Sequence, residues 1–366
     1  MKALIIGHYG GRNFGDELML VRLLRRRDGS AIRVQTPDGV ISPDLRRLGV
    51  EAGYSRAPGQ ILKGIWWADT VVLGGGTMFH DGYPHDRYRD YWRNLLALAL
   101  VFALARLLGR HVSLIGVGVG PLHRWRTRVF TTLLKVAAND ITVRDRQSYD
   151  DLAALPGGAS KVSIADDLSA FVPLPPKEPA ARRLLGISLV PPAVVPGAEQ
   201  VAVEAFYDAL AGRVSEALGS GAFDGVMLIS ANVGKDSDQA VALQMLWLLG
   251  APVGRVEHLV FAGDPRAFAQ QIGRCSLVIA ARYHVAVAAR VMAVPTIWLA
   301  YQRKVADAAQ NSGVAAADLF AMSDLCADDG LRAALFTRML AARGDAPPRQ
   351  EREVLDPTAA LLERAV

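Results

Sequence analysis

The segment from Cys275 to Lys304 constrains the fold more than any other part of the sequence. It contains two short apolar runs, Leu277–Ala280 and Thr296–Ala300, separated by an apolar stretch of helical length and a Val-Pro break. Both runs are continuous rather than alternating in polarity, which is typical of strands buried on both faces of a parallel sheet. The segment therefore predicts a strand–helix–strand unit of an α/β protein.

Three basic or titratable side chains fall where these elements meet. Arg282 and His284 lie between the first strand and its helix, and Lys304 follows the second strand. Ligands of open α/β sheets bind beside the carboxyl ends of the strands, where helix N-termini favour an anion. A guanidinium group can bind phosphate or carboxylate, and a histidine can transfer a proton near neutral pH. The pattern predicts an anion site, although a surface ion pair and a helix cap would use the same residues.

The length of the chain indicates two domains. With 366 residues it is too long for one ordinary core, and a proline-rich charged linker at 173–183 separates two runs of strands and helices. We expect an N-terminal domain over 1–172, a C-terminal domain over 184–343, and a hinge with a terminal helix over 344–366. Two Rossmann-like α/β domains facing a cleft would provide the usual place for a ligand pocket.

The first glycine-rich segment, Gly7–Glu17, follows an expected strand at Lys2–Ile6 and includes Asn13 and Asp16. Backbone N–H groups in such a segment can contact a phosphate or another polar ligand. The spacing matches neither the dinucleotide-binding motif nor the P-loop. We interpret Glu17 as a helix cap, and Asp16 as either a cap or a base.

Two further glycine-rich segments, Gly74–Thr77 and Gly116–Pro121, follow expected strands. Glycines there permit close approach of a ligand to the backbone, or they form a tight turn. We expect the first of them to contact the substrate through Gly75, Gly76 and Thr77.

Arg144 ends another expected strand, Ile141–Val143. At the carboxyl end of that strand it would either bind substrate or pair with Asp145, and the sequence favours neither.

Basic clusters at Arg22–Arg27, Arg87–Arg93 and Arg124–Arg128 contribute to the net charge of +5. No nucleic-acid-binding motif accompanies them, so we expect no nucleic-acid partner. An anionic substrate, or an anionic membrane surface that carries a lipid-linked one, is equally compatible. Each cluster taken alone is most simply a solvated helix face.

Apolar runs and cysteines indicate a cytoplasmic protein. The longest apolar run, Leu95–Ala105, is too short to span a membrane, and the N-terminus begins with a strand rather than a secretory signal. Cys275 and Cys326 lack metal-binding spacing, so we expect reduced thiols and no metal site.

The ordered motifs resemble those of the polysaccharide pyruvyl transferase family. The matching segments are Gly7–Glu17, Val71–Thr77, Gly116–Pro121, Ile141–Ser148 and Arg282–Lys304. The resemblance implies a GT-B-like pair of domains. It also implies transfer of the pyruvyl unit of phosphoenolpyruvate to a sugar, commonly as a cyclic ketal, with phosphate release and no cofactor beyond this co-substrate.

The resemblance also implies roles for individual residues. It maps the phosphoenolpyruvate site onto Arg282 and His284 of the C-terminal domain, and leaves the sugar acceptor to the N-terminal domain. We expect Tyr283, between them, to contact the substrate. We interpret Arg282 as the anion clamp and His284 as the general acid that protonates the methylene carbon. Lys304 would support phosphate departure, and Asp16 would accept the proton of the sugar hydroxyl.

Two departures from the family pattern leave alternatives open. Ala281 stands where members often have serine, and Leu189–Pro192 lacks an arginine that many members carry after this strand, so Arg144 or Lys304 would supply that contact. A glycosyltransferase that uses a nucleotide sugar, with Glu257 on the ribose, is one alternative. A sugar-binding or anion-binding relative without activity is the other. The motifs specify neither the acceptor sugar nor an oligomeric state.

Overall fold

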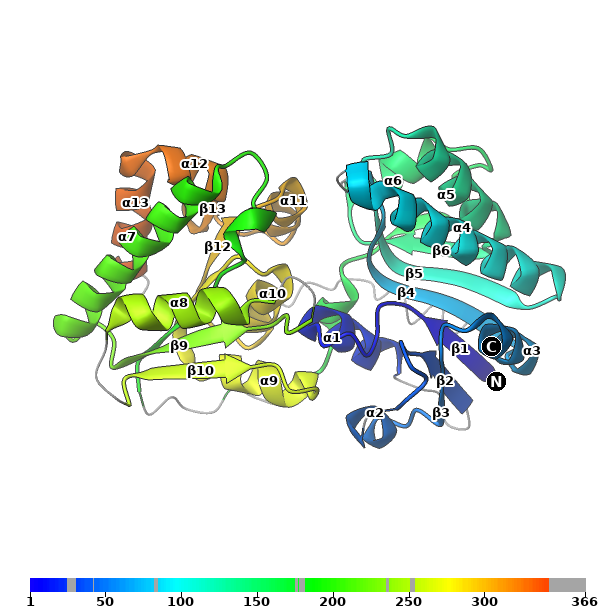
Figure 1. The fold of residues 1–366 in the computed structure, drawn as a ribbon, viewed down its shortest axis with the longest axis horizontal. Coiled ribbons are helices and arrows are strands. Elements are labelled where there is room, and N and C mark those ends of the chain that lie inside the picture. The colour runs from blue at the N-terminus through cyan, green and yellow to red at the C-terminus, as the bar shows by residue number, and fades with distance from the viewer. Residues whose placement is uncertain are drawn as a thin grey trace. The chain divides into compact units, whose positions relative to one another are not determined.

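The computed structural model describes residues 1–24, 31–41, 43–81, 85–174, 177, 182–234, 237–250 and 254–341. The expected hinge and terminal helix at 344–366 and most of the expected linker lie outside these ranges. The described residues form two compact units (Figure 1). Unit 1 contains residues 1–11 and 16–172, and unit 2 contains residues 12–15 and 173–341.

Unit 1 contains a parallel sheet with the strand order β3-β2-β1-β4-β5-β6-β7 among its described residues. Its strands are β1 Lys2–Ile6, β2 Ala31–Gln35, β3 Ala52–Tyr54, β4 Thr70–Phe79, β5 His111–Val119, β6 Asp140–Val143 and β7 Val162–Ile164. Its helices are α1 Phe14–Leu23, α2 Pro43–Arg47, α3 Pro58–Trp67, α4 His85–Leu107, α5 Trp125–Ala137 and α6 Arg146–Ala153, followed by a 3₁₀ turn at Leu168–Phe171. None of the helices described in either unit is both long and apolar enough to cross a membrane.

Helices cover both faces of the unit 1 sheet. One apolar cluster contains Ile65 of α3, Phe102 of α4 and Leu134 of α5. A second cluster contains Met19 of α1 and Leu45 of α2. The strands between the two clusters are buried on both sides, which explains why their sequences are continuously apolar.

Strands β4 and β5 are longer than the sequence predicts. The expected glycine loops at 74–77 and 116–119 were wrong, because these residues pair with each other as strand, with Gly76 opposite Val117 and Thr77 opposite Gly118. Glycine is required here by close packing: a Cβ atom on Gly74 would overlap Leu23 and the Tyr9 hydroxyl. Tertiary packing therefore overrides the low strand propensity of glycine.

Unit 2 contains a second parallel sheet, with the order β10-β9-β8-β11-β12-β13 in its described part. Its strands are β8 Leu184–Ser188, β9 Gly225–Ser230, β10 Val256–Val260, β11 Cys275–Ala280, β12 Thr296–Ala300 and β13 Leu319–Ala321. Its helices are α7 Gln200–Gly219, α8 Gln239–Leu249, α9 Pro265–Ile272, α10 Tyr283–Val291, α11 Arg303–Asn311, α12 Met322–Ala327 and α13 Asp329–Ala341, with 3₁₀ turns at Pro192–Val194 and Ala316–Asp318.

The predicted strand–helix–strand unit is confirmed as β11, α10 and β12. The two strands pair in parallel, with Val278 opposite Thr296 and Ile279 opposite Ile297. The sequence interpretation missed the three-residue edge strands β3 and β13 and the short helices α2, α3, α6, α11 and α12. Elements of this length contain too few turns or alternations to show a clear period.

Residues 12–15 belong to unit 2 although they follow the first strand of unit 1. The backbone N–H of Phe14 donates to Ala231 O at 2.9 Å, and that of Val233 donates to Arg12 O at 3.1 Å. The fully buried Phe14 ring lies 4.7 Å from the ring of Phe268 and 5.8 Å from that of Phe261, measured between centroids. An aromatic cluster thus anchors this short segment on unit 2.

We expect Phe14→Ala to destabilise unit 2 by about 3–5 kcal/mol, because it removes a fully buried ring and leaves a cavity. Hydrogen exchange of peptides from β9 and α9 across a urea series measures this loss. Phe130→Ala, at a partly buried ring on α5 of unit 1, is the control and should leave these peptides unchanged. Equal protection in wild type and Phe14→Ala would contradict the anchoring role.

Candidate functional site

Arg282 lies at the carboxyl end of β11, as the sequence predicts, and is the N-cap residue of α10 with φ −75° and ψ 118°. The preceding residue, Ala281, donates its N–H to Ser188 O of β8 at 2.7 Å. The arginine therefore stands at the edge formed by two central strands and at the N-terminus of a helix, a position that favours an anion.

Asp238 binds the Arg282 guanidinium. Arg282 Nε donates to Asp238 Oδ1 at 2.8 Å, and Nη2 donates to the same oxygen. The other oxygen, Oδ2, accepts the N–H groups of Ala231 at 3.1 Å and Asn232 at 2.9 Å. Only 1% of the Asp238 side chain is exposed, so this is a buried ion pair in which both carboxylate oxygens are hydrogen-bonded.

Burial and the ion pair have opposing effects on the pKa values of Asp238 and Arg282. Burial raises the pKa of Asp238, although Arg282 and the two backbone N–H groups act to lower it. Burial acts to lower the pKa of Arg282, but Asp238 and Tyr301 raise that pKa above its usual value. Arg282 is therefore charged at any pH at which the protein is folded, and Asp238 fixes its orientation.

His284 is the second residue of α10, following Tyr283. A Cβ atom on Gly15 would overlap the Nδ1 atom of His284, so the backbone of the 12–15 segment passes directly beside the imidazole. The Tyr283 ring lies 4.8 Å from the imidazole and 6.0 Å from the ring of Trp298, between centroids. The histidine ring is thus held by a backbone that must be glycine and by an aromatic neighbour.

The structure brings Asn13 into the same group. Asn13 and Asn232 form an antiparallel bridge, and Asn13 Oδ1 accepts the N–H of Gly15 at 2.9 Å. Lys304 is the second residue of α11, directly after β12 as expected, and its side chain lies outside the described residues.

The predicted site residues of unit 1 gather at the ends of β4, β5 and β6. Gly75 and Gly76 have φ values of +57° and +85°, which favour glycine, and a Cβ atom on Gly76 would lie 3.7 Å from Asp16 Oδ1. Asp16 therefore lies beside the Gly75–Thr77 segment, and its role as a base stays a prediction.

Arg144 connects these strand ends. Its Nη2 donates to Thr77 Oγ1 at 2.6 Å, its Nη1 donates to Asp167 Oδ2 at 3.3 Å, and its Nε lies 3.6 Å from Asp145. The guanidinium is largely buried between two carboxylates, so the ion pairing expected as one alternative is present. Its contribution to substrate binding stays a prediction.

The interpretation of Glu17 as a helix cap was wrong. The first N–H groups of α1 donate elsewhere, that of Phe14 to Ala231 O and that of Gly15 to Asn13 Oδ1. The buried Glu17 carboxylate instead accepts the N–H of Gly10 at 2.6 Å. Burial raises the pKa of Glu17 to about 7, with a smaller contribution from Asp16 and an opposing one from Gly10. An acid that titrates near neutral pH therefore lies beside Asp16.

Sequence reasoning missed Asp238 and the burial of Glu17. Both are acidic residues at the beginning of a helix, where a cap is the ordinary expectation. Nothing in their local sequence shows that each carboxylate binds a group from a different element.

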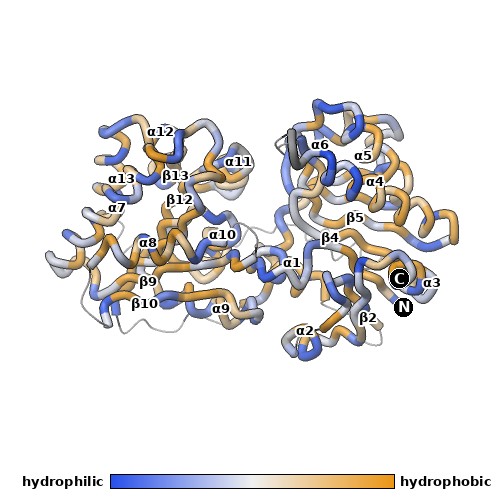
Figure 2. Tube along the Cα trace, viewed as in Figure 1, coloured by the Kyte–Doolittle hydropathy of each residue, from blue (hydrophilic) through white to orange (hydrophobic). Residues whose placement is uncertain are grey.

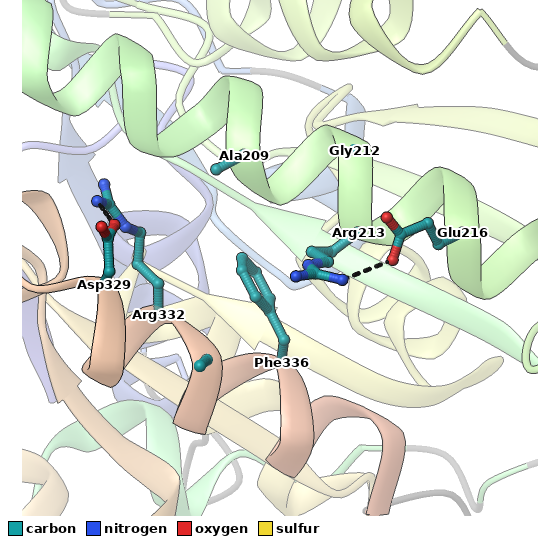
Figure 3. Close-up of a pocket in the computed structure, with 8 residues that line it drawn as sticks. Ala209, Gly212, Arg213, Glu216, Asp329, Arg332 and Phe336 are labelled. Carbon is teal, nitrogen blue, oxygen red and sulfur yellow. Dashed lines mark hydrogen bonds and ion pairs between the residues drawn. The ribbon is translucent and has the colours of Figure 1, made fainter.

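A surface pocket of about 410 Å³ lies between α7 and α13 of unit 2 (Figure 3). Its arginines are paired with acidic neighbours, Arg213 with Glu216 at 2.8 Å and Arg332 with Asp329. It is distinct from the α10 site, because the residues that line it include none of the predicted site residues.

The fold and the comparisons define the class of protein. Two parallel sheets flanked by helices form a GT-B-like α/β protein, and the UDP-GlcNAc 2-epimerase of Methanocaldococcus jannaschii has a TM-score of 0.59 with the chain at 12% identity, covering 100% of both chains. Alr3699/HepE of Anabaena, solved with UDP and glucose, has a TM-score of 0.57 at 14% identity and the same coverage. MnaA of S. aureus, solved with UDP, has a TM-score of 0.57 at 10% identity and covers 98% of this chain and 94% of its own.

The family model for polysaccharide pyruvyl transferase matches residues 13–303. The chain therefore belongs to the polysaccharide pyruvyl transferase family, as its motifs predict. No curated protein sequence matches the chain.

We expect Asp238→Asn to reduce the free energy of unfolding of unit 2 by about 2–4 kcal/mol, because it leaves the Arg282 charge buried without its partner. Urea unfolding measures the loss. Asp264→Asn, at the exposed N-cap of α9, should cost little, because asparagine caps a helix about as well as aspartate. The double variant Asp238→Asn/Arg282→Met should recover much of the loss. Additive costs of the two substitutions would show that the pair is not coupled.

Glu17 should make stability depend on pH. Its pKa is about 7 in the folded protein and has an ordinary value of 4.5, so between these values the folded state holds a proton that the unfolded state has lost. The contribution of Glu17 to stability therefore falls by about 3 kcal/mol as the pH rises from 4.5 to 7, and then levels off. Glu17→Gln should match wild type near pH 4.5 and exceed its unfolding free energy at pH 8. A difference that does not change with pH would contradict this assignment.

Proposed function

We propose that the protein transfers the pyruvyl unit of phosphoenolpyruvate to two hydroxyl groups of a sugar, forming a cyclic ketal and releasing phosphate. The observation that carries this proposal is the Arg282–His284 pair at the N-terminus of α10, in a chain of this family. Phosphoenolpyruvate has a carboxylate and a phosphate, and a fixed guanidinium at the N-terminus of a helix suits such a ligand.

The proposed reaction needs one proton donor and one acceptor. His284 protonates the methylene carbon of phosphoenolpyruvate, which becomes a methyl group and leaves C2 electrophilic. A sugar hydroxyl attacks C2 and loses its proton to Asp16, our candidate for the base in unit 1. A second hydroxyl then displaces phosphate from C2 and passes its proton to the departing phosphate, which closes the ketal. Lys304 supports phosphate departure, and the chemistry requires no further cofactor.

The acceptor is a sugar of a polysaccharide or glycolipid precursor, which we assign to unit 1 because of Asp16 and the Gly75–Thr77 segment. Such precursors are assembled in the cytoplasm, which is where we place the protein. A lipid-linked acceptor would bring the protein to a membrane surface.

Use of a nucleotide sugar is the second candidate, because the solved structures of similar fold include complexes with UDP and glucose. The position of Glu257, the residue expected to bind the ribose, does not support the use of a nucleotide sugar. Glu257 lies near the amino end of β10 and is paired with Arg182 at 3.4 Å and Arg274 at 3.0 Å. Ligands of parallel sheets bind at the opposite, carboxyl end.

We expect His284→Ala to lower turnover by about 10²–10⁴ with little change in KM for phosphoenolpyruvate, because it removes a proton donor rather than an anion contact. Phosphate release with a panel of sugar acceptors measures both constants. Arg282→Lys should instead raise KM, because lysine lacks the planar fork. His123→Ala, at an exposed histidine of unit 1, is the control.

Three outcomes would contradict the proposal in different ways. Wild-type turnover in His284→Ala would remove the histidine from the mechanism. Binding of phosphoenolpyruvate with no phosphate release from any acceptor would indicate a relative without activity. Stabilisation by UDP-sugars but not by phosphoenolpyruvate, in a thermal-shift series, would favour the second candidate.

A further inference from the structure

The outer surface of helices α4 and α5 in unit 1 combines exposed apolar side chains with arginines. The helices run side by side in the same direction: Tyr88 is hydrogen-bonded to Thr127 at 3.0 Å, and the Trp92 and Phe130 rings lie 6.2 Å apart between centroids. Figure 1 shows them on the same side of the sheet, and Figure 2 shows the apolar later part of α4. The two helices therefore present one continuous surface.

This surface, which we call the α4–α5 face, has apolar residues at helical spacing. On α5 the exposed residues Trp125, Val129, Leu133 and Val136 recur every three or four positions and lie along one stripe. On α4 an exposed leucine near the end of the helix, Leu107, has 83% of its surface accessible. Large apolar side chains gathered on one surface in this way mark an interaction site.

The charge of this part of the chain has a single sign. Between Asp90 and Asp140 the sequence has six arginines and one lysine and no aspartate or glutamate. Among the described residues, neither Arg93, Arg126 nor Arg128 forms an ion pair. The Arg126 guanidinium lies 4.9 Å from the centroid of the Trp125 ring and 5.1 Å from that of Trp92, so it is held at this surface by aromatic rings.

We propose that the α4–α5 face docks on an anionic lipid bilayer. Arginines attract anionic headgroups, and leucine, valine and tryptophan side chains enter the boundary between headgroups and acyl chains, where tryptophan is favoured. A second copy of the chain fits less well, because between Asp90 and Asp140 this face has arginines and no acidic residue to oppose them in a two-fold contact. Aliphatic side chains add nothing to the stacking that binds nucleic acids.

The test is co-sedimentation of the full chain with vesicles of phosphatidylcholine containing 30% phosphatidylglycerol, beside vesicles of phosphatidylcholine alone. Binding to the anionic vesicles should be at least about 20-fold stronger than to the neutral ones, and weaker in high salt. The assay needs no catalytic activity, so its result is independent of the proposed reaction.

Paired variants test whether binding depends on the α4–α5 face itself, or only on net charge and on exposed apolar side chains anywhere in the chain. Arg93→Glu/Arg128→Glu should lower binding by at least about 20-fold. Arg46→Glu/Arg56→Glu, at exposed arginines elsewhere in unit 1, makes the same change in net charge and should have little effect. Trp125→Ala should weaken binding several-fold. Trp247→Ala, at a still more exposed tryptophan on the uncharged helix α8, should not.

Each other outcome overturns the proposal. No binding of wild type to anionic vesicles, or equal binding to neutral ones, would exclude an anionic bilayer as the partner. Equal losses in the test and control variants would mean that binding is not located on this face. A dimer in analytical ultracentrifugation that dissociates in Trp125→Ala would show instead that the face joins two copies of the chain. Circular dichroism of each variant verifies that it is folded.

Discussion

The candidate site of unit 2 depends on the buried ion pair between Arg282 and Asp238. Removing two charges from water is costly, and the cost is offset only where geometry and hydrogen bonding are good. Here one carboxylate oxygen binds the arginine, and the other binds the N–H groups of Ala231 and Asn232. The carboxylate therefore joins the end of β9 to the beginning of α10. A guanidinium held in this way has lost most of its rotational freedom before any ligand arrives, which lowers the entropic cost of binding an anion.

The same strand end holds the segment that contacts the proposed acid. Ala231 accepts a hydrogen bond from Phe14, and Asn232 pairs with Asn13. Gly15, which follows Phe14 in the chain, lies against the His284 imidazole. Arg282 and His284 are thus positioned by one short loop after β9, the first through Asp238 and the second through residues 13–15. Because this loop positions both Arg282 and His284, a substitution that changes its conformation would affect anion binding and proton transfer together.

Much of this architecture could be predicted from the sequence, because it depends on local patterns. Continuous apolar runs identified β11 and β12, and the rule that ligands bind at the carboxyl ends of parallel strands pointed to Arg282 and His284. Asp238 could not be found in this way, because its partner is 44 residues distant and its own sequence context resembles a cap. The glycines of β4 were misread for a related reason: their requirement comes from Leu23 and Tyr9, which approach from other elements. Interactions between distant elements leave little trace in local sequence.

The net charge of the chain likewise does not show where its charges lie in unit 1. A net charge of +5 over the whole chain is modest, yet residues 91–139, which cover most of α4 and all of β5 and α5, contain no aspartate or glutamate. Even the one buried cation of α5, Lys135, is bound by main-chain oxygens, because its Nζ donates to Leu152 O and Leu155 O at 2.7 Å each. A carboxylate would be the usual partner for a buried ammonium group. Carbonyl partners satisfy its hydrogen bonds without adding a negative charge to this part of unit 1.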